Sequence, residues 1–363
     1  MKKKAIVIPS LLVLTVFCMI YTIDIWIPFI QRQMPKPEIV IDKPTRKEAI
    51  DTLIAKLNEN YVFPEKAKQV ETLLRQHMKE GRYDRITDGE QFANQLTIDL
   101  HGVTRDLHMG VRASAKPVPY DREIPPPPTS RADWERRIPF SRRMLLELGL
   151  LLGKVGTPKV DHLDHNIGYL KLTDFPPDFI MAERYATVMD KLADTDSLII
   201  DLRDHDGGSP TTVALLVSYF VDGRTRVNDL WDRTTGATIQ QWTLDRLDGK
   251  RYGSKKPVVI LVGRETMSAG EDFAYTMQAL NRATIVGEAT WGGAHPTRGF
   301  RLGDHFAASI PARRSISPIT GSNWEGVGVI PDIPASHNNA MTVAEDVLLR
   351  RIQKPAVLAA AGQ

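Results

Sequence analysis

Beyond residue 166 the chain alternates short apolar runs with helical patterns, and this alternation is the feature that most limits the folds open to it. SLIIDLR at 197–203 and PVVILV at 257–262 are typical of strands buried on both faces of a sheet, because they do not alternate regularly between apolar and polar residues. Helical patterns lie at 179–193, 211–221 and 269–280. Strands that alternate with helices predict a sheet covered by helices. We therefore expect an α/β core over residues 166–363.

Residues 46–116 carry a different pattern, which predicts a small helical bundle. Ile50, Leu53, Ile54 and Leu57 recur at helical spacing and would share one face. Similar apolar sets follow at Val70, Leu73 and Leu74, and at Phe92, Leu96 and Leu100.

Residues 117–165 separate these two regions and predict a proline-rich insertion. PVPYDREIPPPPTS cannot form a regular helix or a central strand, because proline fixes φ and lacks an amide donor. WERRIPFSRRMLLELGLLLGK then combines arginines with a leucine-rich helix. This pattern leaves four roles open: a lid, a subunit contact, an interfacial membrane element, or an insertion packed on the core.

Residues 1–30 predict a membrane anchor, and the polar residues 31–45 predict a linker. An apolar run from Ala5 to Ile23 follows three lysines and is close to the ~20 residues that span a hydrocarbon core. The run is long for a cleaved signal peptide, so we expect an uncleaved anchor with the rest of the chain in the periplasm or exterior. Secretion after signal cleavage is the alternative.

Cysteine content and charge exclude several classes of site. Cys18 is the only cysteine and lies inside the apolar run, so the exported part has no disulfide, no cysteine zinc site and no cysteine nucleophile. The net charge of +3 equals that of the three lysines near the start, so the remainder is near neutral and we expect no nucleic-acid partner. The histidines and carboxylates show no recognised ligand spacing, and we expect neither a metal nor a cofactor.

Ser268 begins the helix predicted after PVVILV and admits two interpretations. With Glu271 three residues later it forms the pattern of a capping box, which needs no chemistry. A serine at a helix N-terminus after a buried strand is also a place for a nucleophile, because free amides there favour an oxyanion. Gly207 and Gly208 follow the strand SLIIDLR, and their amides, with that of Ala269, are candidate oxyanion donors.

A serine nucleophile needs a base, and two histidines are candidates. His295 lies in TWGGAHP, close to Ser268 in sequence, whereas His108 lies in TRDLHMGV, two residues after Asp106. Glu325 in NWEGVGVIPDI supplies a carboxylate that would orient an imidazole and stabilise its protonated form.

Taken in order, these motifs resemble the C-terminal-processing, or tail-specific, serine protease family, in the branch related to interphotoreceptor retinoid-binding protein and the tricorn core protease. YVFPEKAKQV, GRYDRITDGEQFANQLTIDL and TRDLHMGV resemble that branch's N-terminal domain. NIGYLKLTDF, LIIDLRDHDGG, ETMSAGEDFAYTMQALNRATIVGEATWGGA and WEGVGVIPDI resemble its core. The resemblance covers most of residues 46–335 and implies a crotonase/ClpP-like α/β protease core.

The resemblance also implies roles for individual residues. Family members with a serine-lysine dyad carry the lysine in a TFGKG-like stretch, but here the stretch is TWGGA and Gly293 stands in the lysine's place. The tricorn-like solution uses serine, histidine and glutamate, which match Ser268, His108 and Glu325. The residue before the histidine is a serine in tricorn and Leu107 here, which removes one polar support. Residues 117–165 do not resemble the PDZ domain that many members carry.

The resemblance implies a serine endopeptidase whose partner is a peptide or protein substrate, and the apolar run at the start of the chain predicts that it is membrane-anchored. Gly207, Gly208 and Ala269 would bind the oxyanion, and His295 stays open as an alternative base. A non-catalytic carrier of apolar ligands, with a pocket lined by residues 144–152, is the other function to consider. Assembly into a homo-oligomer also stays open.

Overall fold

The computed structural model describes residues 38–118, 130–138, 140–153 and 155–360. The predicted anchor at 1–30 lies outside these ranges. Within them, no helix combines the length and the apolar character needed to cross a membrane.

Three helices form the N-terminal region, as predicted: α2 (Lys43–Asn60), α3 (Pro64–Lys79) and α4 (Gly89–Thr104). Local chemistry sets two of their starts, because the Asp42 side chain accepts from the Thr45 amide and that of Asp88 from the Gln91 amide. Their core also contains Phe306 and Ile310, which come from a strand two hundred residues later. The helical region is therefore completed by the C-terminal part of the chain.

A six-stranded sheet forms the α/β core, in agreement with the predicted alternation. Its order is β12-β8-β7-β4-β3-β2, and every neighbouring pair is parallel except β2 and β3. The strands are β2 (Lys159–Leu163), β3 (Ile167–Lys171), β4 (Ser197–Asp201), β7 (Val258–Val262), β8 (Thr284–Gly287) and β12 (Ile333–Pro334). A single 3₁₀ turn, η1 (Asp164–Asn166), joins β2 to β3.

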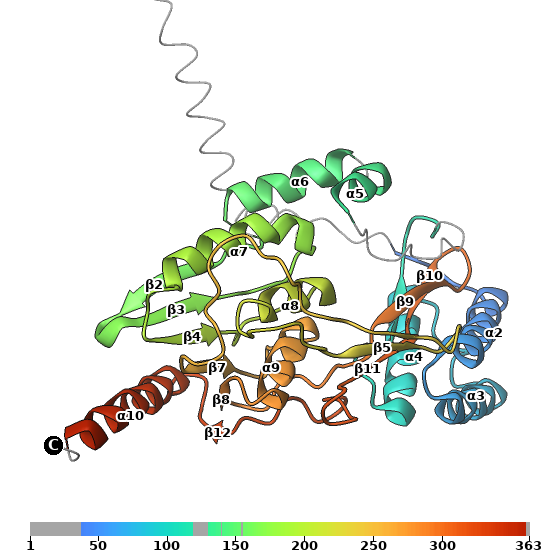
Figure 1. Cartoon of the computed structure of the whole chain (residues 1–363). Coiled ribbons are helices and arrows are strands. Elements are labelled where there is room, and N and C mark those ends of the chain that lie inside the picture. Colours follow the sequence, from blue (N-terminus) through green and yellow to red (C-terminus); the bar gives the residue numbers. More distant parts are fainter. Residues whose placement is uncertain (1–37, 119–129, 139, 154, 361–363) are drawn as a thin grey trace, which may run out of the picture.

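Helices cover both faces of this sheet (Figure 1). On one face lie α7 (Asp178–Leu192), α8 (Pro210–Val217) and α9 (Ala269–Ala279), and on the other lies α10 (Ala340–Ala360). Every residue of β4 and β7 is buried, because each strand packs against helices on both sides. Their carboxyl ends, where ligands bind in such sheets, lead into the loops at 202–209 and 263–268.

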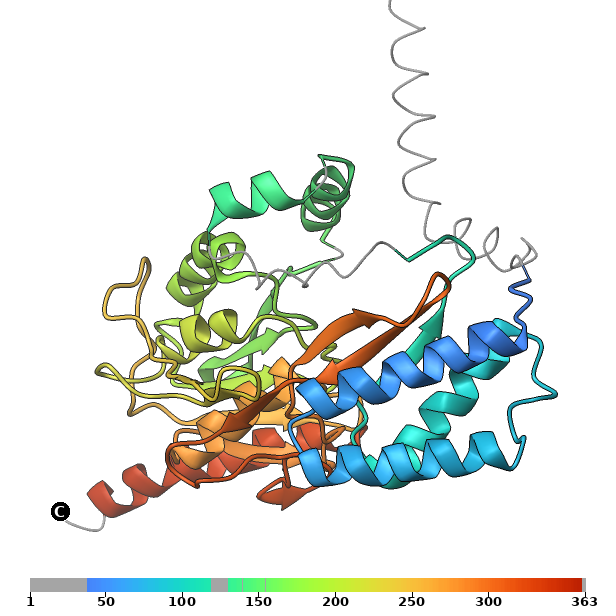
Figure 2. The ribbon, with the colours of Figure 1, turned by 90° about the vertical axis from the view of Figure 1, so that its right-hand side faces the viewer.

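Two three-stranded antiparallel sheets join the helical region to the core. One contains β1 (Gly110–Ala113), β10 (Phe306–Pro311) and β9 (Thr297–Arg301), and the other contains β11 (Arg313–Ile316), β5 (Asp229–Asp232) and β6 (Thr238–Ile239). Figure 2 shows β9 and β10, in orange, between the blue helices of the N-terminal region and the core. The pairing of β1 with β10 brings the segment before β1, which contains His108, beside the C-terminal half of the chain.

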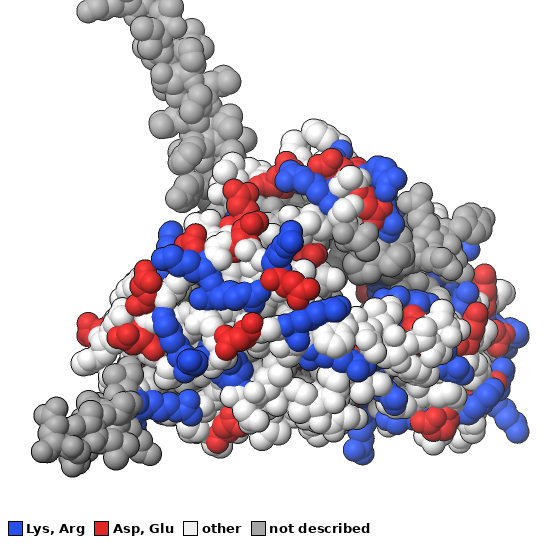
Figure 3. Space-filling view, viewed as in Figure 1, with Lys and Arg blue, Asp and Glu red and all other residues white. Residues whose placement is uncertain are grey.

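The insertion forms two helices, α5 (Arg131–Arg137) and α6 (Phe140–Leu151), which lie over α7 (Figure 1). Trp134 is buried against Phe179, with ring centroids 6.3 Å apart. The outer face of α6 exposes Met144 and Leu145. On the face of the molecule in Figure 3, basic and acidic side chains are intermixed, so an anionic polymer would meet both signs of charge there.

Candidate active site

Ser268 sits at the turn between β7 and α9 in a strained backbone conformation. Its φ of 50° and ψ of −113° lie outside the regions that residues with a Cβ normally adopt. Such strain persists only where the surroundings impose it, and it clusters at functional sites. The Met267 amide donates to the His205 carbonyl at 2.8 Å, and the Ser268 amide donates to Glu271 Oε2 at 2.9 Å. The turn that presents the Ser268 hydroxyl is therefore held from both sides.

Gly207 and Gly208 pass directly beside this turn. A Cβ on Gly207 would lie 2.9 Å from Ser268 Cβ, and one on Gly208 would lie 2.1 Å from the Phe175 carbonyl oxygen, so only glycine fits at either position. The Gly207 amide donates to His205 Nδ1 at 3.0 Å and is not free to bind an oxyanion in this structure. This corrects the assignment of the Gly207 amide as a donor to the oxyanion. Among the described residues, nothing accepts from the amides of Gly208 and Ala269.

The buried carboxylate of Glu271 does more than cap α9. Its Oε2 accepts from the amides of Ser268 and Gly293, at 2.9 and 3.0 Å, and its Oε1 accepts from the Gly292 amide at 2.6 Å and the Thr290 hydroxyl at 2.5 Å. Burial raises the pKa of Glu271, while these four hydrogen bonds oppose the rise. The capping-box pattern identified this residue, but only the structure shows that it joins the serine turn to the loop at 290–293.

His108 reaches the same loop from the helical region. Its ring packs edge-on against Trp291, with centroids 4.8 Å apart, and lies against Gly293, where a Cβ would fall 2.3 Å from His108 Cε1. Its amide donates to Asp106 Oδ1 at 3.2 Å. Burial lowers the pKa of His108, the Asp106 charge opposes this, and His295 lowers it further. A neutral imidazole near pH 7 is the form that can accept a proton.

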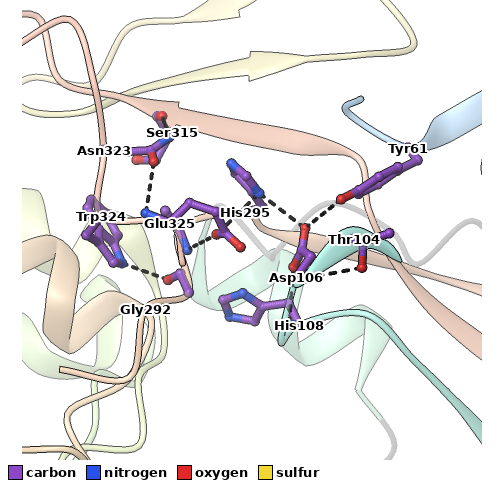
Figure 4. Close-up of polar contacts among 12 residues, drawn as sticks. Tyr61, Thr104, Asp106, His108, Gly292, His295, Ser315, Asn323, Trp324 and Glu325 are labelled. Atoms are coloured by element: carbon purple, nitrogen blue, oxygen red, sulfur yellow. Dashed lines mark hydrogen bonds and ion pairs between the residues drawn. The ribbon is translucent and has the colours of Figure 1, made fainter. Parts of the chain in front are cut away.

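Among the described residues no hydrogen bond or ion pair joins Glu325 to His108. Glu325, which is half-buried, instead forms a cluster with the buried Asp106 and His295, which we call the acid–histidine cluster (Figure 4). His295 Nδ1 lies 3.2 Å from Asp106 Oδ2 and 3.2 Å from Glu325 Oε2. The Tyr61 hydroxyl donates to Asp106, and the Ala294 amide donates to Glu325 Oε2 at 2.7 Å. The expected direct pairing of Glu325 with His108 is replaced by pairing with His295.

Burial and neighbouring charges perturb the pKa of Glu325 within the acid–histidine cluster. Burial raises the pKa of Glu325 to about 7, with His295 opposing the rise and Asp106 adding to it. The three ligand atoms lie within 4.8 Å of one another, which is close enough to consider a cation. His295 Nδ1 lies within hydrogen-bonding distance of Asp106 Oδ2, and Glu325 Oε2 would form an ion pair with the same nitrogen when the ring is protonated.

The structure thus gathers the predicted residues in two groups that meet at Gly293. Ser268, Gly208 and Ala269 lie on the core side, and His108 lies on the other side with the acid–histidine cluster behind it. In the sequence Asp106 is only a near neighbour of His108, whereas in the structure its contact with His295 joins positions 189 residues apart.

Comparison with known proteins identifies two matching family models. Residues 166–335 match peptidase family S41, and residues 38–138 match the N-terminal domain of that family as found in eukaryotic interphotoreceptor retinoid-binding protein. Carboxyl-terminal-processing peptidase 2 from chloroplasts of Arabidopsis thaliana is 29% identical over 46% of this chain and 32% of its own length. The tricorn protease of Thermoplasma volcanium is 26% identical over 39% of this chain and 12% of its own. The chain thus spans a third or less of the length of these two relatives.

A solved lipoprotein structure from Streptococcus agalactiae has a TM-score of 0.53 and 13% identity, covering 86% of this chain and 99% of that one. At this identity the likeness shows a shared fold alone.

Proposed function

Because the chain belongs to peptidase family S41, we propose that it is a serine peptidase that hydrolyses peptide bonds with Ser268 as nucleophile and His108 as base. The observation that carries the proposal is the strained turn of Ser268 at the start of α9 and its link to His108. The neutral imidazole of His108 packs against Gly293, and the Gly293 amide shares a Glu271 oxygen with the Ser268 amide. Strain at a strand-to-helix turn exposes a serine hydroxyl in other hydrolases as well. Protein or peptide substrates follow from this chemistry.

Each of these residues has its own role in the proposed acyl transfer. Ser268 Oγ attacks the scissile carbonyl carbon while its proton passes to the His108 ring, and the amides of Gly208 and Ala269 bind the developing oxyanion. Collapse of the intermediate breaks the C–N bond, and His108 returns the proton to the leaving amine. A water then attacks the acyl-enzyme with His108 again as base, which releases the second product and restores Ser268.

Glu271 is a positioning residue in this proposal. It holds the Ser268 amide and the Gly293 amide on one carboxylate oxygen, so it sets the spacing between the nucleophile's turn and the surface on which His108 rests. Asp106 favours the protonated form of His108, which stabilises the imidazolium that forms during attack. Glu325 acts on His108 through the acid–histidine cluster rather than by direct contact.

His295 is a second candidate for the base, because its Nδ1 faces two carboxylates, as in a catalytic triad. It is almost wholly buried, at 1% exposure, whereas His108 is partly exposed. His108 is therefore the better placed to meet a substrate. Loss of turnover in His295→Ala with retention in His108→Ala would reverse this assignment.

Membrane anchoring through residues 1–30, with the catalytic part in the periplasm or exterior, belongs to the same proposal and rests on the apolar run from Ala5 to Ile23. Secretion after cleavage is the alternative, and assembly into a homo-oligomer stays open. The carrier function gains no support from α6, because Met144, Leu145 and Leu151 are 53%, 64% and 81% exposed rather than lining an enclosed pocket.

Labelling with a fluorophosphonate probe tests the proposal. We expect the full chain to be labelled, Ser268→Ala to lose labelling entirely, and His108→Ala to be labelled far more slowly. Ser130→Ala is the matched control, because Ser130 also caps a helix but lies in the insertion, and it should label normally. Equal labelling of wild type and Ser268→Ala would remove Ser268 from the mechanism.

A further inference from the structure

His205 is a fully buried histidine to which the proposed mechanism gives no role. It lies in the loop at 202–209 that follows β4, and its exposure is 0%. The ring packs on Phe175, with ring centroids 4.3 Å apart, and against Gly270, where a Cβ would fall 2.5 Å from His205 Nδ1. The imidazole therefore lies between the segment before α7 and the first turn of α9, which begins at Ala269.

Two hydrogen bonds join His205 to both parts of the oxyanion site. Its Nδ1 accepts from the Gly207 amide at 3.0 Å, and its backbone carbonyl accepts from the Met267 amide at 2.8 Å. Gly207 directly precedes the proposed donor Gly208, and Met267 directly precedes the proposed nucleophile Ser268. One residue thus holds the loop of an oxyanion donor and the turn of the nucleophile.

The bonds around Gly207 fix the direction of the next amide, that of Gly208. The Gly207 carbonyl accepts from the Phe175 amide at 2.8 Å, and the N–H of a trans peptide points opposite to its carbonyl. The Gly208 N–H therefore points away from Phe175. The bond to His205 holds the preceding peptide unit, so the two units that meet at the Gly207 Cα are both fixed. An amide that is already oriented stabilises an oxyanion without reorganisation during the reaction.

The acceptor on its ring is the property that distinguishes His205 from an apolar residue at this position. Nδ1 accepts from an amide only without a proton, so the ring is the neutral tautomer with its proton on Nε2. Burial lowers the pKa of His205 to about 3, which keeps the ring neutral at pH 7. Nε2 has no hydrogen-bond partner in the described part of the chain, and a buried unpaired donor costs about 1–3 kcal/mol. A phenyl ring would fill the space without this cost, but it could not hold the Gly207 amide.

We propose that His205 is a positioning residue that sets the direction of the Gly208 amide and its distance from the Ala269 amide. The inference rests on the proposed peptidase function. In this role His205 does not touch the substrate, and it acts through the Gly207 amide and the first turn of α9. Because the oxyanion forms only on the way to the transition state, misdirected donors lower kcat and leave KM nearly unchanged.

Substitutions at position 205 separate the acceptor from the space that the ring fills. His205→Phe keeps an aromatic ring without an acceptor, and His205→Leu is a second variant without one, should the phenyl ring not fit. The side chain of His205→Asn can accept from the amide two residues later, as in an Asx turn.

Hydrolysis by the full chain of a quenched fluorescent peptide, selected from a randomised library, gives kcat and KM for these variants. We expect His205→Phe and His205→Leu to lower kcat by about tenfold or more with little change in KM, since loss of a whole oxyanion donor costs about 10²–10³-fold. His205→Asn should recover most of this loss. His305→Phe is the matched control and should keep its kcat, because His305 Nδ1 also bonds to the backbone, at the Ser114 carbonyl, but lies in the loop before β10.

Hydrogen exchange of the Gly207 amide, followed by NMR, does not depend on turnover. The amide should be protected in wild type and in His205→Asn, and it should exchange faster in the variants without an acceptor. Fast exchange in wild type would overturn the inference, because the bond to the ring would then be absent in solution.

The two measurements separate failure of this inference from failure of the peptidase function. Equal kcat in His205→Asn and in the folded variants without an acceptor would show that the ring only fills space, and Ser268-dependent hydrolysis would stand. A protected Gly207 amide in a wild type without Ser268-dependent hydrolysis would instead overturn the peptidase function, and with it the role of His205 in that reaction.

Discussion

The imidazole of His108 lies so close to Gly293 that a Cβ on this glycine would fall 2.3 Å from His108 Cε1 and 2.7 Å from Nδ1. The amide of Gly293 donates to the same oxygen of Glu271 that accepts from the Ser268 amide. The glycine therefore provides both the room for the proposed base and its link to the nucleophile. The resemblance places a lysine here in other family members, and a lysine side chain and the His108 ring would compete for this space.

Replacement of Gly293 by alanine should displace His108 and reduce fluorophosphonate labelling by about 100-fold, since misplacement of a catalytic group by about 1 Å has that effect. The clash should also appear in stability. In a double-mutant cycle, Gly293→Ala should be less destabilising in a His108→Ala background, with a coupling energy of roughly 0.5–3 kcal/mol. Urea unfolding of the four proteins measures this, and strict additivity would contradict the contact.

Glu271→Gln should weaken both the fold and the reaction. The glutamine NH₂ group would face backbone amides that need an acceptor, which costs about 1–3 kcal/mol in unfolding free energy. Because Glu271 positions the serine turn without touching substrate, kcat should fall while KM changes little. Thr290→Val provides a milder comparison, since it removes only the hydroxyl that donates to Glu271. A Glu271→Gln enzyme with wild-type kcat would show that the turn holds its shape without this carboxylate.

The rate of labelling should rise with pH and level off at a pH below the usual histidine pKa of 6.5. His108 must be neutral to act as base, and burial lowers its pKa from 6.5, so the neutral form persists to lower pH. Asp106→Asn should move the midpoint of this pH profile to a still lower pH, because the Asp106 charge raises the pKa of His108. A midpoint near pH 7 that disappears in Glu325→Gln would instead report the carboxyl of Glu325. Burial raises the pKa of that group to about 7.

Glycine in place of Ser268 should make the protein more stable while abolishing its chemistry. Glycine adopts positive φ without steric strain, whereas alanine keeps the Cβ. The free energy of unfolding of Ser268→Gly should therefore be about 1 kcal/mol higher than that of Ser268→Ala. Thermal or urea unfolding compares the two variants directly, and neither should label. If alanine proved the more stable of the pair, the turn would not be strained in solution.

Local sequence patterns predicted much of this architecture. The unbroken apolar runs of β4 and β7 predicted buried strands, because only a strand covered on both faces tolerates apolar residues at every position. The position of Ser268 after such a strand, with Glu271 one helical turn later, predicted the start of α9 at this residue. These features depend on the chemistry of near neighbours, which the sequence specifies directly.

The connections between distant segments were decided only by the tertiary structure. Glu325 pairs with His295 rather than His108, and the Gly207 amide is taken by His205, because hydrogen bonds go to whichever partner the packed backbone brings within about 3 Å. The contact between Asp106 and His295 spans 189 residues and depends on how β1 and β10 join the helical region to the core. Periodicity reports which face of an element is buried, but not which distant loop will meet it, so the composition of the acid–histidine cluster emerged only from the fold.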